Sequence, residues 1–204
     1  MILPDGYTDL PPGKIASVVT YLEMLQPPPV GPAEAPPGLS VRLVEQPSLD
    51  WYRRLYSDVG REWLWFNRLR MDDLTLAAAI HHPLVQVYAL HDGQADKGLL
   101  ELDGRSDGRS KDEIEITYFG LTADFIGRGA GQYLMRYGLA AAWARNPRRV
   151  WVHTCTLDHP RALSFYLKAG FVPFKRAIEI ADDPRLTGHA PRSAAGHIPL
   201  IDSR

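Results

Sequence analysis

The sequence predicts an α/β (α+β) fold with a mixed, mostly antiparallel central sheet of six to seven strands flanked by helices. Short apolar segments with alternating character recur from residue 39 to residue 180. Three of them, at residues 85–91, 97–103 and 113–121, follow one another with only turn-rich segments between, which indicates a meander of antiparallel strands. Beyond residue 121, helix and strand patterns alternate, which favours helices lying on the faces of the sheet.

Each remaining element has its own signal in the chain. Asp72 is expected to cap a helix, because its carboxylate can accept hydrogen bonds from the first helical amides. Gly170 is expected to end a short helix in the left-handed conformation that glycine adopts without a steric penalty. The last strand is expected to be bulged near Pro173. The expected helices lie at residues 49–67, 72–81, 128–145 and 160–169, and the strands outside the meander lie at residues 39–44, 149–157 and 171–180.

The prolines divide the chain unevenly. Nine of the 17 prolines fall in the first 37 residues, and the run PPPVGPAEAPP at residues 27–37 can neither extend a sheet nor hold a helix. We therefore expect an N-terminal extension (residues 1–38), one domain (39–181) and a C-terminal tail or surface arm (182–204). Residues 14–25 are apolar enough to pack against the domain or a partner subunit, and their pattern fits a helix or a strand.

Composition excludes several classes of protein. The 204 residues carry 23 Lys and Arg against 24 Asp and Glu, without the basic excess that a dedicated nucleic-acid-binding protein shows. No apolar run approaches the roughly 18 residues of a membrane-spanning helix. The single cysteine, Cys155, cannot form an internal disulfide or a multi-cysteine zinc site. We expect a cytoplasmic protein with no nucleic-acid partner, no membrane partner and no metal.

A glycine-rich turn at residues 121–135 (LTADFIGRGAGQYLM) is the most informative segment. Small residues at the start of a helix let the backbone approach a ligand, and free N–H groups there hold phosphate without a metal. Neither a Walker A loop nor the GxGxxG fingerprint fits, because no Gly-Lys-Ser/Thr follows and position 132 is Gln132. A mononucleotide-binding protein with this turn is one alternative. Arginines without intervening acids predict a cationic surface beside the turn, at positions 128, 136, 145, 148 and 149.

Two blocks of the sequence resemble motifs of the GNAT acetyltransferase superfamily. Residues 126–131 (IGRGAG) resemble its acyl-CoA motif, Gln/Arg-x-x-Gly-x-Gly/Ala. Residues 162–171 (ALSFYLKAGF) resemble its second block, Asn-x-x-Ala-x-x-x-Tyr-x-x-x-Gly-Phe. The order of the blocks and the helix and strand between them also agree, and the resemblance covers roughly residues 39–180. Ile126 stands where the family usually has Gln or Arg, and His159 stands where it usually has Asn.

The resemblance implies an N-acyltransferase that moves an acetyl or other short acyl group from acyl-CoA directly to an amine in a ternary complex. Acetyl-CoA would be wedged between two splayed strands. Tyr166 would protonate or hydrogen-bond the leaving sulfur, and no covalent enzyme intermediate would be needed, so Cys155 need not be a nucleophile. The implied cofactor-binding residues are Leu121, through its N–H, the turn residues Gly127, Arg128, Gly129, Ala130 and Gly131, and His159.

The catalytic base is implied less directly. Glu115 lies six residues before Leu121, the offset at which the histone acetyltransferase branch of the superfamily places its basic glutamate. An ordered water is the alternative. Strand alternation predicts that Glu113 and Glu115 lie on one face with Phe119 and Leu121, where two carboxylates would raise each other's pKa.

The acceptor site is implied to lie among the first helices. Tyr56, Trp63 and Trp65 are the candidate wall residues, and an aromatic cleft with acids suits a cationic amine. The expected partner is therefore a small-molecule amine or a protein amine, and a second copy of the chain in a homodimer. The main alternative function is a non-catalytic acyl-CoA-binding or regulatory module on the same fold.

Overall fold

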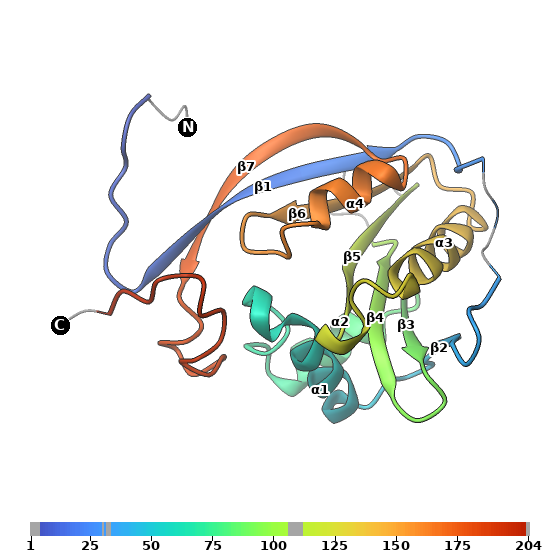
Figure 1. Cartoon of the computed structure of the whole chain (residues 1–204), viewed down its shortest axis with the longest axis horizontal. Coiled ribbons are helices and arrows are strands. Elements are labelled where there is room, and N and C mark those ends of the chain that lie inside the picture. The colour runs from blue at the N-terminus through green and yellow to red at the C-terminus, as the bar shows by residue number, and fades with distance from the viewer. Residues whose placement is uncertain (1–4, 30, 32–33, 106–111, 203–204) are drawn as a thin grey trace.

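In the computed structural model, which describes residues 5–29, 31, 34–105 and 112–202, seven strands form one sheet in the order β2-β3-β4-β5-β6-β1-β7 (Figure 1). Only the β5–β6 pair is parallel, which confirms the predicted mixed, mostly antiparallel sheet. The strands are β1 (Lys14–Met24), β2 (Ser40–Leu43), β3 (Val85–His91), β4 (Asp96–Asp103), β5 (Glu113–Leu121), β6 (Arg149–Cys155) and β7 (Val172–Asp182). The turn-rich segment expected between the strands at residues 97–103 and 113–121 lies largely outside the described residues.

The helices cover both faces of the sheet. Asp72 caps α2 as predicted, its carboxylate accepting from the N–H of Thr75 at 2.7 Å. The first helix ends earlier than residue 67, because a 3-10 turn follows it and Leu64 then takes a left-handed conformation (φ 52°). None of the described helices is long and apolar enough to cross a membrane. The helices are α1 (Leu49–Gly60), α2 (Asp73–Ile80), α3 (Ala130–Trp143) and α4 (Ala162–Lys168), with 3-10 turns η1 (Arg61–Trp63) and η2 (Ala123–Phe125).

Residues 14–24 form strand β1, which settles the choice between helix and strand. β1 lies inside the sheet, between β6 and β7, with Tyr21 opposite His153 on one side and Lys175 on the other. Strand β2 lies at the far edge of the sheet, so the segment with the proline spacer connects two distant strands of one sheet (Figure 1). The predicted division at residue 38 therefore falls between two strands of the same sheet.

A β-bulge in β5 determines which side chains reach which face. Glu101 lies opposite Tyr118 and Leu102 opposite Ile116, so Thr117 is an extra residue that inverts the alternation. Phe119 and Leu121 consequently pack with Ile116 in the cluster under α3, whereas Glu115 lies on the opposite face. The predicted common face for Glu115, Phe119 and Leu121 is wrong for this reason.

The ends of the sheet carry two further features. The bulge expected near Pro173 is present, because Tyr21 faces Lys175 and Leu22 faces Pro173, which leaves Phe174 as the extra residue. After β7 the chain folds back as an arm, which packs Ala194 and Ala195 against Leu64 and Phe66. This arm therefore supports the loop that follows α1 (Figure 1).

Candidate active site

Strands β5 and β6 separate in the middle of the sheet. Their parallel pairing runs from Glu113 and Arg149 to Ile116 and Val152 and stops there, at the point where the Thr117 bulge begins. A cavity of about 490 Å³ lies where the strands diverge. Its walls come from β5, the end of β6, α4, the glycine turn and the loop after α1. The predicted splayed strands are therefore present.

Most residues singled out from the sequence line this cavity, although they come from distant parts of the chain. Among the described residues, Glu115, Arg128 and Ala130 lie off its wall. The Arg128 guanidinium stacks over the ring of Phe125, 5.4 Å from its centroid, and Ala130 is fully buried. The wall residues are Tyr56, Trp63, Trp65, Leu121, Gly127, Gly129, Gly131, His159 and Tyr166.

The glycine turn presents backbone amides to the cavity. Gly127 (φ 87°) and Gly129 (φ 80°) hold the left-handed conformation that favours glycine, and Gly129 is the N-cap of α3. The amides of Gln132 and Tyr133 donate to the Gly129 carbonyl at 3.1 and 3.3 Å, so the hydrogen bonding of the helix begins there. Among the described residues, none supplies an acceptor to the amides of residues 127–131. Such a turn can bind a phosphate group.

The predicted cationic surface beside the turn is present only in part, because Arg128 lies exposed in the turn but Arg148 and Arg149 lie far from it. Arg148 and Arg149 form ion pairs with Glu113 at 2.7 and 2.5 Å where β5 and β6 begin. Glu113 is therefore paired with arginines and not with Glu115, whereas the sequence predicted that the two carboxylates would raise each other's pKa. Helix α3 alone places Arg148 and Arg149 about 20 Å from the turn, at 1.5 Å per residue. The cationic side chains on the cavity wall are Arg161 and Lys168, both next to or within α4. Sequence reasoning missed them because they are separated from the turn by a helix and a strand.

The N–H of Leu121 faces the gap between β5 and β6. The neighbouring N–H of Thr122 donates to the carbonyl of Lys97 in the direction of β4, at 2.9 Å. Successive amides of a strand point to opposite edges, so the Leu121 amide points away from β4. On that side, β6 has already separated from β5.

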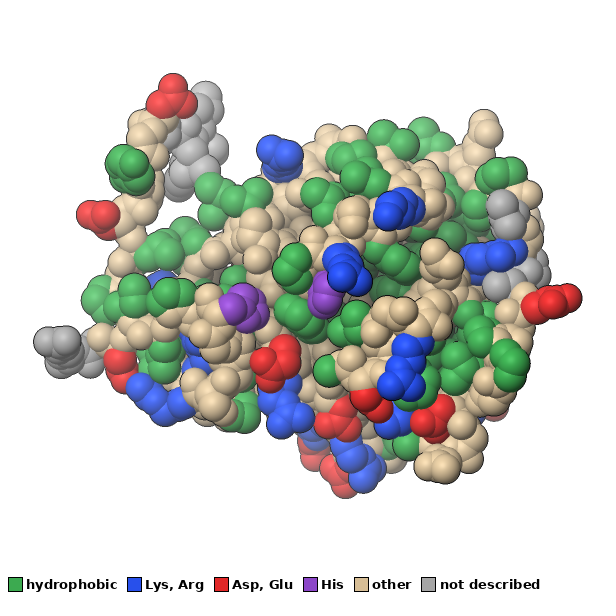
Figure 2. Space-filling model, viewed as in Figure 1, with side chains coloured by type: hydrophobic (Ala, Val, Ile, Leu, Met, Phe, Trp, Pro, Cys, Tyr) green, Lys and Arg blue, Asp and Glu red, His purple; other side chains and the backbone are tan. Residues whose placement is uncertain are grey.

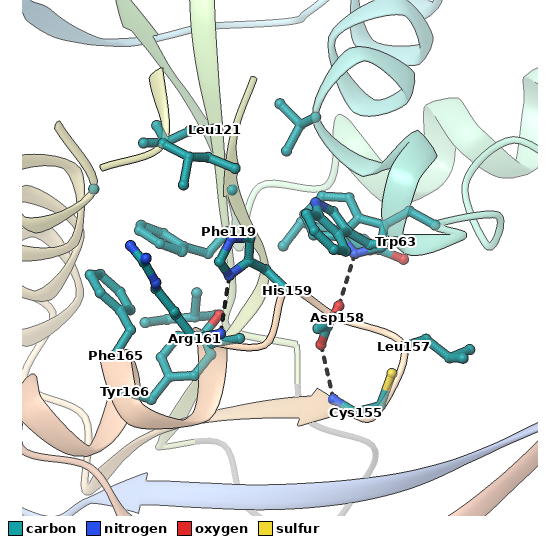
Figure 3. Close-up of a pocket in the computed structure, with 18 of the residues that line it drawn as sticks. Trp63, Phe119, Leu121, Cys155, Leu157, Asp158, His159, Arg161, Phe165 and Tyr166 are labelled. Carbon is teal, nitrogen blue, oxygen red and sulfur yellow. Dashed lines mark hydrogen bonds between the residues drawn. The ribbon is translucent and has the colours of Figure 1, made fainter. Parts of the chain in front are cut away.

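Tyr166 lies on α4 with its ring packed against Phe119 and Phe165 (Figure 3) and against Phe171. It is 6% exposed and reaches the cavity wall. Burial, followed by the negative charge of Asp158, raises the pKa of the Tyr166 hydroxyl well above its usual value. The phenol therefore keeps its proton at physiological pH and can act as a hydrogen-bond donor or an acid.

Asp158 is a cavity residue that the sequence analysis missed. Its Oδ1 accepts from the indole N–H of Trp65 at 3.2 Å and its Oδ2 from the Cys155 N–H at 2.9 Å (Figure 3). Oδ2 also accepts from the Thr154 hydroxyl at 2.8 Å. The partners lie up to 93 residues apart, so no local pattern reveals the cluster. The only available signal was its place next to His159 at the start of the second motif block.

The aromatic wall stands opposite α4. The ring of Trp65 packs against Tyr56 and Tyr118, with centroids 5.4 and 5.3 Å away, and Tyr56 is fully buried. Trp63 meets His159 edge to face at 5.0 Å. Figure 2 shows basic side chains on the α4 side of this face, acidic and basic ones together on the α1 side, and histidines between. The cavity wall itself carries the cations Arg161 and Lys168 on one side and, on the other, an aromatic half whose Trp65 contacts the acid Asp158.

Two histidines on the wall have different hydrogen bonds. His159 accepts the N–H of Arg161 at Nδ1 (3.0 Å), and burial, followed by the charge of Arg161, lowers its pKa. His153 Nδ1 lies 3.2 Å from Oε1 of Glu115, which itself lies behind the wall. Cys155 also lines the wall, and burial, then the charge of Asp158, raises the pKa of its thiol. Within the described residues, no group of three or more His, Cys, Asp or Glu side chains could hold a metal ion.

The model of the acetyltransferase (GNAT) family matches residues 48–171, well over half of the chain. The chain belongs to this family. The match includes both motif blocks and the strands that diverge, which confirms the resemblance predicted from the sequence. No curated protein matches the sequence of this GNAT chain.

Solved structures agree with the GNAT fold at low identity. A putative GNAT acetyltransferase from Novosphingobium aromaticivorans matches with a TM-score of 0.57 and 15% identity, over 84% of this chain and 67% of the other. An aminoglycoside acetyltransferase from an uncultured soil metagenomic sample matches with a TM-score of 0.55 and 16% identity, over 65% and 88%. A functionally unknown protein from Staphylococcus epidermidis matches with a TM-score of 0.53 and 16% identity, over 84% of this chain and 64% of its own length. The GNAT chain thus spans less than two thirds of that last protein.

Proposed function

We propose that this GNAT chain transfers an acetyl or other short acyl group from acyl-CoA directly to an amine while both substrates are bound. One observation carries the proposal: a single cavity joins an amide-rich turn with cationic side chains to an aromatic, acidic half, through the gap between β5 and β6. An anionic acyl donor suits the first half and a cationic amine suits the second. The gap is where the two would meet.

The residues present fit acetyl-CoA. When bound, it supplies the acyl group as a thioester. The amides of residues 127–131 would hold its diphosphate, helped by Arg161 and Lys168, which reach the same cavity. Ile126 offers no side-chain hydrogen bond, so the backbone of the turn carries this contact. His159 accepts a hydrogen bond at Nδ1 from the Arg161 N–H, so in the neutral ring Nε2 carries the hydrogen and would donate to an amide oxygen of the pantetheine arm.

The chemistry follows from groups at the gap. The Leu121 N–H would donate to the thioester oxygen and stabilise the negative charge that develops there as the amine attacks. Tyr166 would give its proton to the leaving sulfur, for which its raised pKa keeps the proton available. The Cys155 thiol, whose pKa is also raised, takes no covalent part.

The acceptor belongs to the aromatic half. Trp63 and Trp65 offer ring faces, Tyr56 packs against Trp65, and the Asp158 carboxylate lies beside them. A small-molecule amine, as for the aminoglycoside acetyltransferase of similar fold, and a protein amine are both acceptors of this kind. A cytoplasmic location and a homodimer are part of the proposal, because acetyl-CoA is made inside cells and β7 leaves one sheet edge open.

The test is thiol release from acetyl-CoA with a panel of amines, compared between the native protein and Tyr166→Phe. We expect turnover with at least one amine and a fall in kcat of about 10²-fold or more in the variant, the range of general acid catalysis. Tyr137→Phe is the matched control, because Tyr137 packs on Tyr88 away from the cavity. Tight acetyl-CoA binding without turnover on any amine would instead favour the non-catalytic module. Ile126, which replaces the usual polar side chain of the family, is consistent with that alternative.

A further inference from the structure

We propose that His153 takes the proton from the acceptor amine and that Glu115 acts through it as a positioning residue. The inference rests on the proposed acyl transfer and specifies its base. It replaces the direct role for Glu115 that the family resemblance implied, with an ordered water as its alternative.

The placement of the two side chains supports this order. Glu115 pairs with Trp151 in the parallel register of β5 and β6, and His153 is the next residue of β6 on that face. His153 lies beyond the last paired residues, at the gap, and lines the cavity. Glu115 reaches the cavity only through its 3.2 Å contact with Nδ1 of His153. A substrate in the cavity therefore meets the imidazole first.

The contact with Glu115 decides which nitrogen of His153 can accept a proton. Nδ1 lies 3.2 Å from a carboxylate oxygen, which can only accept, so in the neutral ring the hydrogen belongs on Nδ1 and Nε2 keeps its lone pair. His159 has the reverse arrangement, because its Nδ1 accepts the Arg161 N–H and its Nε2 is the donor. Of these two wall histidines, only His153 is held in the form of a base.

The surroundings of His153 bias it toward the charged form. Burial alone would lower its pKa, but the hydrogen bond and charge of Glu115 outweigh it, with smaller contributions from Asp158 and Glu179, and the pKa is raised above 6.5. The ring of Tyr21 lies 5.6 Å away on β1, and the ammonium of Lys175 on β7 stacks over that ring at 4.5 Å. The imidazolium formed by proton transfer therefore faces carboxylates on β5, β7 and the loop after β6.

The proton balance is complete with these groups. A cationic acceptor first loses one proton from its ammonium group to solvent, which gives the nitrogen a lone pair. As the bond from the amine nitrogen to the acyl carbon forms and the carbon–sulfur bond breaks, the nitrogen gives a second proton to Nε2 of His153. The sulfur receives the proton of the Tyr166 hydroxyl. His153 then releases its proton to solvent, which its 40% exposed side chain can reach, and Tyr166 regains one. No oxidant, reductant or metal is needed.

The experiment compares the pH dependence of kcat, with both substrates saturating, in the native protein, His153→Gln, Glu115→Gln and the control His189→Gln. His189 lies on the C-terminal arm and contacts Thr187. In the native protein we expect kcat to decline at low pH, where His153 is protonated; this decline is the acidic limb of the profile. For His153→Gln we expect kcat to fall by about 10²-fold and the acidic limb to disappear. For Glu115→Gln we expect a limb at lower pH than the native one, because the charge that raises the pKa of His153 is gone, with most of the plateau kcat retained.

Opposite results would overturn the proposal. If Glu115 were itself the base, Glu115→Gln would lose activity at every pH and His153→Gln would keep the limb. If an ordered water were the base, neither variant would shift the acidic limb of the pH profile. The His153 Cε1–H titration by NMR in the protein without substrates tests the pair even if no amine is turned over. We expect a pKa above 6.5 that falls in Glu115→Gln, and an unchanged titration would refute the pair independently of the proposed function.

Discussion

The indole N–H of Trp65 donates to Oδ1 of Asp158 at 3.2 Å, joining the loop after α1 to the end of β6 across the cavity. The other oxygen of Asp158 is held by the Thr154 hydroxyl and the Cys155 N–H. Three donors on one carboxylate fix its position, so hydrogen bonds connect the aromatic wall to β6, the strand that carries His153. These bonds hold the two halves of the cavity at a fixed distance from each other.

Trp65→Phe should distinguish the contribution of the hydrogen bond to Asp158 from that of the packing of the Trp65 ring. The variant keeps an aromatic ring but removes the donor, and we expect a loss of about 1 kcal/mol in the free energy of unfolding and a several-fold higher KM for the acceptor. Trp51→Phe is the matched control, because its indole N–H donates to Asp96 at 2.8 Å far from the cavity. Urea unfolding and initial rates measure both. Equal acceptor KM values in the two variants would show that the hydrogen bond to Asp158 does not shape the site.

Gly131→Ala tests whether the turn is shaped for a ligand rather than for folding. A Cβ at Gly131 would meet Leu121 and Phe165 at an ordinary 3.7 Å, and alanine favours helix, so stability should hold or rise by up to about 1 kcal/mol. The methyl group would stand where the phosphate approaches the amides, and we expect the KM for acetyl-CoA to rise about tenfold, or ~1.4 kcal/mol of binding.

Gly138→Ala gives the contrasting result. Its Cβ would lie 2.6 Å from Cδ2 of the fully buried Leu100, so we expect a loss of about 1–3 kcal/mol in stability with an unchanged KM for acetyl-CoA. Thermal unfolding and acetyl-CoA titration distinguish the two variants. Native affinity for acetyl-CoA in Gly131→Ala would show that the turn is not part of the binding site.

The sequence predicted features that depend on local pattern. Motif spacing identified the turn and Tyr166, and N-cap chemistry located Asp72, because each of these signals lies within a few residues. It did not predict Asp158, whose role depends on a tryptophan 93 residues away, nor the face of Glu115 relative to Leu121, which depends on one extra residue in β5. The sequence also did not predict the location of β1, since the same apolar pattern occurs in an edge strand, an inner strand or a helix.

Arg185→Met should release the C-terminal arm. Arg185 pairs with Asp183 at 2.7 Å and donates to the Ile198 carbonyl at 2.8 Å, and both charged side chains are buried. The variant leaves a buried carboxylate unpaired, so we expect a loss of about 3–5 kcal/mol, and a higher acceptor KM because the arm packs on Leu64. Arg192→Met, which breaks an exposed pair with Asp202, should cost less than about 1 kcal/mol.

The same pair predicts a pH dependence. Burial would raise the pKa of Asp183, but its hydrogen bonds and the charge of Arg185 lower it overall. A carboxyl whose pKa is lowered on folding stabilises the protein above its unfolded value near ~3.9, and that stabilisation is lost as pH falls through the folded pKa. In Arg185→Met burial instead raises the pKa of the unpaired Asp183, so the stability difference between native protein and variant should be largest near neutral pH and shrink as falling pH protonates Asp183 in the variant. A difference that did not shrink in acid would contradict this role of Asp183.

Strand β7 leaves one edge of the sheet open along 11 residues. Ile178 and Ile180 lie on one face, opposite Val18 and Ala16, and are 52% and 55% exposed. Long exposed edges with apolar side chains are sites of pairing with another chain. A second copy suits this edge, because antiparallel pairing of two β7 strands about Ala177 places Lys175 opposite Glu179 of the partner subunit.

We therefore expect a homodimer that depends on β7. Lys175→Glu should give a monomer, because it sets two carboxylates opposite each other at both ends of the pairing. Combining it with Glu179→Lys restores opposite charges and should restore the dimer, an outcome that simple damage to the strand could not produce. Ile201→Lys, on the exposed end of the arm, is the control for an added charge. Sedimentation equilibrium at micromolar concentration gives the mass of each variant. A native monomer, or a double variant that stays monomeric, would contradict pairing about Ala177.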